Sequence, residues 1–182
     1  MSFNNVLKIV VFTLLVGVAV RGNDDSPYTV EIDNFEISKE YDQKFVNWDT
    51  LGLKQKGRNK FVVSGSFTVN LNLANEQKVN LQVFPYDKEK QAKGPLVFNI
   101  EREICKFVAE DEDIYPGIKE KSNLPEPGSC PLSKGEYTID DYEMNADFLP
   151  ADTPKGDYLL VFLLKDGMSP VAGFTAIITI SE

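Results

Sequence analysis

The feature that most constrains this chain is a run of alternating residues at positions 61–73. One set, which includes Phe61, Phe67 and Leu71, is mostly apolar, and the residues between them are mostly polar. Period-two alternation places the two sets on opposite faces of an extended strand, whereas a helix would scatter them around its circumference. The run therefore predicts a long strand with one face in a hydrophobic interior.

Further strand patterns follow at short intervals, which predicts an all-β fold. Residues 74–77 are typical of a turn, and the alternation resumes at residues 79–83, so we expect a hairpin there. Asp166-Gly167 is a hairpin turn signal between two later apolar runs. The remaining candidate strands are residues 28–32, 45–53, 96–100, 137–139, 158–164 and 171–180. About eight strands at this spacing predict a two-sheet antiparallel β-sandwich, Ig-like in outline.

Residues 104–128 depart from the strand pattern. Ile104, Phe107 and Val108 have helical spacing, which allows at most a short helix. The acidic run at residues 110–113 lacks the alternating ligands of a calcium loop, so we interpret it as a solvated surface loop. Several prolines follow, and the segment is expected to be one long connection of the sandwich.

The chain has two cysteines, Cys105 and Cys130, which bracket this connection. In a secreted protein an even count predicts a disulfide, and only one intramolecular pairing exists. A free thiol pair or a metal site is the alternative. The metal site is disfavoured because the chain has no histidine and no third cysteine.

The N-terminus predicts secretion. Residues 6–20 are almost entirely apolar, too short for a comfortable membrane span but the right length for the core of a signal peptide. We expect cleavage after Gly22, leaving residues 23–182 as a single extracellular domain without a transmembrane segment. An N-terminal membrane anchor is the alternative.

Charge and composition disfavour several functions. The net charge is −9, and removing residues 1–22 takes away Lys8 and Arg21 and makes it −11. An acidic protein repels nucleic acid at long range, so no nucleic-acid partner is expected. Without histidine the usual nucleophile–base schemes are excluded, and no phosphate-binding glycine loop is present. We expect no enzymatic activity, no cofactor and no metal.

Three short segments resemble a known family. They are ICKFV at residues 104–108, GSCPL at 128–132 and PKGDYLL at 154–160. In this order they resemble an insect secreted family of lipid-recognition-like (ML-like) proteins, to which the CheB chemosensory proteins are similar. The resemblance implies a sandwich whose sheets part to hold a lipid. Many relatives carry another cysteine in the first strand, where this chain has FEIS at residues 35–38, so hydrogen bonds and packing alone would hold that strand.

The apolar strand faces are the main candidate for a ligand site. The same residue types would form a solid core, so composition does not separate a cavity from a packed interior. Trp48, the only tryptophan, is expected in the core, with contact to a ligand or membrane as the alternative. The candidate cavity residues are Phe61, Phe67, Leu71, Leu81, Val83, Phe98, Phe162 and Ile177.

Basic residues gather in two presumed turns. Counting strands places these turns at the same end of the sheet, where they would form a basic rim able to meet an anionic headgroup. Two separate solvated turns are the alternative. The candidate rim residues are Lys54, Lys56, Arg58 and Lys60 in one turn, and Lys88, Lys90 and Lys93 in the other.

Together these features predict a secreted binding protein for a small hydrophobic ligand such as a lipid, sterol or hydrocarbon. It would act as a carrier or as an accessory to an extracellular receptor. The alternative is a secreted protein-interaction module with a solid core and no lipid ligand.

Overall fold

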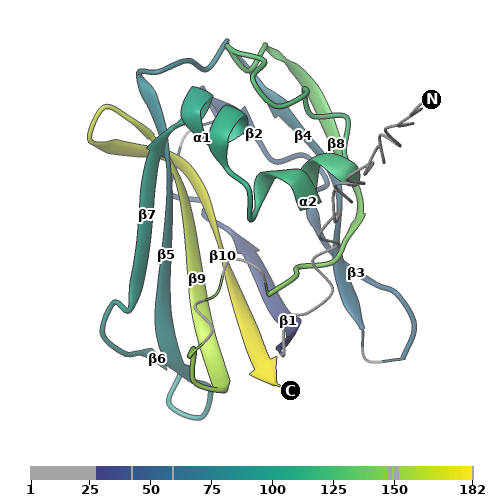
Figure 1. The fold of residues 1–182 in the computed structure, drawn as a ribbon, viewed down its shortest axis with the longest axis vertical. Coiled ribbons are helices and arrows are strands. Elements are labelled where there is room, and N and C mark those ends of the chain that lie inside the picture. Colours follow the sequence, from purple (N-terminus) through teal and green to yellow (C-terminus); the bar gives the residue numbers. More distant parts are fainter. Residues whose placement is uncertain (1–27, 42, 59, 147–148, 150–151, 182) are drawn as a thin grey trace, which may run out of the picture.

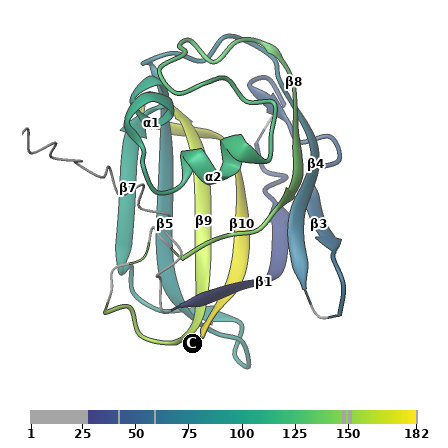
Figure 2. The ribbon, with the colours of Figure 1, turned by 45° about the vertical axis from the view of Figure 1, so that its right-hand side comes forward.

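The computed structural model describes residues 28–181 except 42, 59, 147–148 and 150–151. The expected signal peptide, residues 1–22, lies outside the described residues. Two antiparallel sheets face each other, with two short helices at one end of the space between them (Figures 1 and 2). The predicted all-β sandwich is confirmed.

The larger sheet contains five of the longer strands in the described chain. Its order is β1 (Thr29–Ile37), β10 (Ser169–Ser181), β9 (Gly156–Asp166) and β5 (Gln77–Asp87). The short β6 (Ala92–Lys93) and the edge strand β7 (Phe98–Glu103) both pair with β5. β9 and β10 form the hairpin that Asp166-Gly167 predicts.

The smaller sheet is built around β4 (Phe61–Val69), the strand that the alternating run predicts. β2 (Val46–Asn47) and β3 (Gly52–Gln55) pair with one edge of β4, and β8 (Gly135–Tyr142) pairs with the other. Gly65 has φ +126°, and a Cβ there would lie 2.3 Å from the Thr50 carbonyl oxygen. Glycine at this position therefore permits the close approach of the segment before β3.

The predicted hairpin between residues 61–73 and 79–83 is wrong. β4 belongs to the smaller sheet and β5 to the larger one, so the connection between them crosses the sandwich. Strand β4 ends at Val69, and Leu73 instead forms an isolated bridge to Leu132. Both segments form strands, as their patterns predict, but two strands joined by a short turn need not pair with each other.

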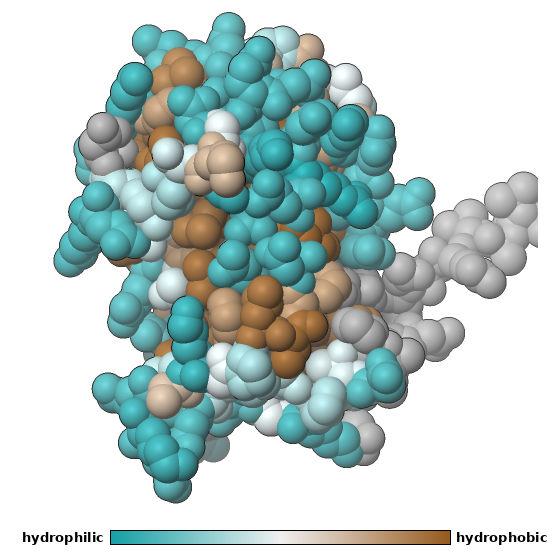
Figure 3. All heavy atoms as spheres, turned by 90° about the vertical axis from the view of Figure 1, so that its left-hand side faces the viewer, coloured by the Kyte–Doolittle hydropathy of each residue, from teal (hydrophilic) through white to brown (hydrophobic). Residues whose placement is uncertain are grey.

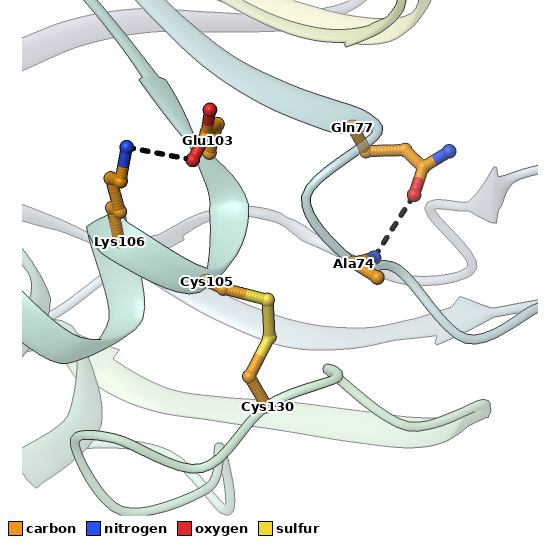
Figure 4. The surroundings of a disulfide bond; sticks show 6 residues. All are labelled: Ala74, Gln77, Glu103, Cys105, Lys106 and Cys130. Atoms are coloured by element: carbon orange, nitrogen blue, oxygen red, sulfur yellow. Dashed lines mark hydrogen bonds and ion pairs between the residues drawn. A yellow bond between two sulfur atoms is a disulfide. The ribbon is translucent and has the colours of Figure 1, made fainter.

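The long connection carries two helices where at most one was expected. α1 (Ile104–Glu110) matches the predicted helical spacing, and α2 (Tyr115–Glu120) follows it. Cys105 in α1 and Cys130 form the predicted disulfide, with their Cα atoms 5.5 Å apart (Figure 4). Beside it, Lys106 pairs with Glu103 at 2.9 Å.

Candidate ligand-binding cavity

The space between the sheets contains an apolar cavity of about 210 Å³. Figure 2 looks into this space, with the larger sheet on one side, β8 and β4 on the other, and α1 and α2 above. The cavity is lined by Ile32, Phe35, Val46, Trp48, Leu51, Val63, Phe67, Val69, Leu73, Val79, Leu81, Ile104, Phe107, Val108, Ile114, Tyr115, Ile118, Leu124, Leu132, Ile139, Tyr142, Met144, Leu160, Phe162, Leu164, Phe174 and Ala176.

The larger sheet supplies one wall through the inward faces of its central strands. Leu81 of β5 is paired with Phe162 of β9, which is paired with Phe174 of β10. Because partners across an antiparallel ladder project to the same side, all three side chains face the smaller sheet. The Phe162 and Phe174 rings stack with centroids 4.7 Å apart. An aromatic surface therefore forms the middle of this wall.

Trp48 connects this wall to the smaller sheet. Its ring lies 5.6 Å from Phe174 and 5.9 Å from Phe67 of β4. Phe67 in turn stacks on Tyr137 of β8 at 5.6 Å. Trp48 thus packs between the two sheets, as expected, and also lines the cavity, whereas its contact with a ligand or membrane stays a prediction.

The helices cover one end of the cavity. α1 contributes Phe107 and Val108 to the lining, and α2 contributes Tyr115 and Ile118. The Asp111 carboxylate, between the helices, accepts hydrogen bonds from the backbone N–H groups of Ile114 at 2.7 Å and Tyr115 at 2.6 Å. The interpretation of residues 110–113 as a solvated loop is therefore wrong for Asp111, which is buried and accepts two backbone hydrogen bonds at the start of α2.

Hydrogen-bonding side chains are scarce in the lining. The Tyr115 hydroxyl donates to the Pro125 carbonyl oxygen at 2.8 Å, and burial raises the pKa of this hydroxyl to about 12. It is therefore neutral at physiological pH and already engaged. None of the lining residues carries a carboxylate or a basic group, so the lining offers a bound molecule mainly apolar contact.

Three of the eight predicted cavity residues, Phe67, Leu81 and Phe162, line the cavity. Phe61 begins β4 and is 41% exposed. Leu71 lies beyond the end of β4 and packs against the core from there. Neither Phe61 nor Leu71 is among the residues that line the cavity.

The other three predictions fail for two different reasons. Val83 and its partner Phe98 pack in the hydrophobic core but are not among the residues that line this cavity. Ile177 lies between Ala176 and Ile178, both of which are buried on the inner side. By strand alternation Ile177 projects from the outer face of the larger sheet.

The lining residues that the sequence did not predict come from strands of both sheets and from the long connection, which supplies seven of them. Ile104, Phe107 and Val108 were noted only as a helical spacing, and α2 was not predicted. Pro116 near the start of α2 is a helix-start signal that favours this position. The small residue Ala176 gave no signal as a cavity residue in the sequence.

The two basic turns lie at the lower end of the molecule in Figure 1, on different sheets. None of the seven predicted rim residues lines the cavity. Acidic side chains accompany most of them, because β8 runs beside β4 and brings Asp141 and Glu143 to the first turn. The expected basic rim is thus a mixed-charge surface.

The ion pairs at these turns are close. Lys54 is 2.9 Å from Asp141, and Lys60 is 2.7 Å from Glu143. Lys56 lies 3.4 Å from Glu143, Lys88 lies 2.7 Å from Asp157, and Lys90 lies 2.6 Å from Asp87. Lys93 stands over the Phe84 ring, 4.4 Å from its centroid. Hydrogen bonds from Lys54 and Lys60 hold the pKa values of Asp141 and Glu143 below their usual range.

The side of the molecule around β7 carries hydrophobic surface. In Figure 3, hydrophobic residues gather in the middle of this face with hydrophilic residues around them. Leu96 and Val97, directly before β7, are 51% and 55% exposed. This face is the strongest exposed candidate for contact with another molecule.

The described residues contain no group of three or more His, Cys, Asp or Glu side chains placed to hold a metal ion. Within the same ranges, no helix has the length and apolar character that crossing a membrane requires.

A family model matches the middle of the chain. Residues 79–160 match the model of a family described as "Protein of unknown function (DUF1091)". The matched stretch runs from β5 into β9 and includes both helices and both cysteines. A search of curated proteins found no match.

Proposed function

We propose that this protein is a secreted carrier, or receptor accessory, for a small hydrophobic ligand that it holds between its two sheets without chemical conversion. The observation that carries the proposal is the cavity of about 210 Å³ with a lining free of acidic and basic side chains. Burial of apolar ligand surface would stabilise the complex by about 25 cal/mol per Å² before the costs of ordering.

The proposal extends to family and location. The sandwich with space between its sheets supports distant membership of the insect ML-like family that the three motifs resemble. The family matched by residues 79–160 has no described function, so the ligand class rests on the cavity itself. The disulfide fits an oxidising compartment and supports secretion.

The test is to express the full chain in insect cells, purify the protein from the medium and analyse a solvent extract by mass spectrometry. We expect the N-terminal segment to be removed and a hydrophobic molecule to copurify in near-stoichiometric amount. An Ala176→Leu variant should carry less of it, because this lining side chain would grow into the cavity. An empty wild-type protein that also binds no added apolar molecule would rule the carrier function out.

The exposed Leu96 and Val97 beside the edge strand β7 favour a second candidate, a protein-interaction module. Under that function a Leu96→Ser/Val97→Ser variant would lose binding to an extracellular partner, and cavity variants would not. Under the carrier function, cavity variants would lower the amount of bound ligand, and the Leu96→Ser/Val97→Ser variant would not.

A further inference from the structure

We infer that the cavity selects uncharged apolar molecules of about eight to ten heavy atoms and discriminates against ionised fatty acids and long acyl chains. This inference rests on the proposed carrier function and adds the size and charge class of the ligand. It depends on the cavity's volume, its lining and the state of the nearby charged groups.

The cavity volume limits the size of the ligand. An apolar cavity of about 150 Å³ in another protein accommodates benzene, which has six heavy atoms. Scaling from that case, a cavity of about 210 Å³ holds roughly eight to ten heavy atoms. A chain of fourteen or more carbons would have to leave a large part of its length outside the lining or displace packed side chains.

The apolar lining favours an uncharged ligand. Its hydrogen-bonding side-chain atoms are the hydroxyls of Tyr115 and Tyr142 and the indole N–H of Trp48. The Tyr115 hydroxyl already donates to a backbone carbonyl. A carboxylate placed among these residues would lose its hydration without meeting a cation, which is strongly unfavourable.

The acidic and basic groups outside the cavity do not offset the cost of burying a ligand carboxylate. Asp111, beside the helices, is itself an acid, and its carboxylate accepts two backbone hydrogen bonds. At the basic turns, Lys54, Lys60 and Lys88 are within 3 Å of carboxylate oxygens. An anionic headgroup would have to displace those partners, and none of these lysines lines the cavity.

Trp48 gives a direct measurement, because it is the only tryptophan of the chain and lines the cavity. The purified protein, stripped of copurifying molecules, is titrated with 1-octanol, octanoate and 1-tetradecanol while tryptophan emission is recorded at neutral pH. 1-Octanol and octanoate have the same chain length and differ in charge, and the two alcohols differ only in length.

We expect 1-octanol to change the emission saturably, octanoate to bind at least about 10-fold more weakly, and 1-tetradecanol to bind no more tightly than 1-octanol. The length result is the sharper one, because the added methylenes of 1-tetradecanol would strengthen binding at an unrestricted apolar site. Octanoate binding within threefold of 1-octanol, or tighter binding of 1-tetradecanol, would overturn the inference while leaving the carrier function intact.

The controls separate the inference from the function it rests on. Ala176→Leu should abolish the response to 1-octanol, and Ile177→Leu, on the opposite face of the same strand, should retain it. If Ala176→Leu does not fold, the three wild-type titrations still decide the inference. If no probe changes the emission and calorimetry detects no binding, the carrier function fails and the inference fails with it.

Discussion

Two regions of the same interior differ in how they are filled. Around the cavity, side chains from both sheets and both helices leave about 210 Å³ unfilled. On the larger sheet, Val83, Tyr158, Ile178 and Ile180 are buried in one core cluster and do not line this cavity. We call these four residues the packed end. Since both regions use the same apolar residue types, geometry and not composition separates a binding space from a core.

The largest difference between the regions should come from removing side-chain volume. Ile178 is fully buried at the packed end, so Ile178→Ala should lower the free energy of unfolding by about 3–5 kcal/mol. Ile139 lines the cavity and already lacks contacts on that side, so Ile139→Ala should cost about half as much. Urea unfolding of both variants measures the difference. Equal losses would mean that the cavity wall is as tightly packed as the packed end.

Loss of the disulfide should affect the cavity region selectively. The bridge closes a 25-residue separation and ties α1, which covers the cavity, to the segment before β8. A Cys105→Ser/Cys130→Ser variant should lose about 2–4 kcal/mol of stability. Hydrogen exchange should rise most in residues 104–132 and least in β9 and β10. A uniform rise over both sheets would contradict this division.

A larger side chain should affect ligand binding in the cavity region and stability at the packed end. Leu81 and Val83 lie two residues apart on the same face of β5, but only Leu81 lines the cavity. Leu81→Trp should block uptake of 1-octanol with a stability loss of less than about 1 kcal/mol. Val83→Trp should overpack the packed end and cost about 1–3 kcal/mol. Calorimetric titration and thermal unfolding of the two variants test this, and a large loss for both would indicate that the cavity does not accept a side chain.

The strands that form both regions were predictable, because period-two alternation is a local property of the chain. The runs at residues 61–73 and 158–164 correspond to β4 and β9. Which strands pair depends on contacts far apart in sequence, and the chain's crossing from β4 to β5 left no local signal. The hairpin was wrongly predicted because the local sequence does not specify strand pairing.

The cavity itself was less predictable for a related reason. Phe67 and Phe162 were identified because large apolar residues in strong strand patterns face the interior. Val83 has the same pattern and is 3% exposed, but it does not line the cavity, although its strand partner Leu160 does. Alternation identifies the face of a strand, whereas the position of a void depends on the separation of the two sheets.

The smallest effect should come from the ion pairs at the basic turns, which lie outside both regions and provide a baseline. Lys60→Gln removes the pair with Glu143, both of whose side chains are about half exposed, so it should cost less than about 0.5 kcal/mol. The hydrogen bond from Lys60 lowers the folded-state pKa of Glu143 below its unfolded value. Its stabilising contribution is therefore present above the unfolded pKa and is lost as the pH falls through the folded pKa. Melting temperatures of wild type and Lys60→Gln should thus converge between about pH 6 and pH 3, and also as salt is raised at pH 6. A difference that persists at low pH and high salt would mean that Lys60 stabilises the fold through packing of its aliphatic stem instead of its charge.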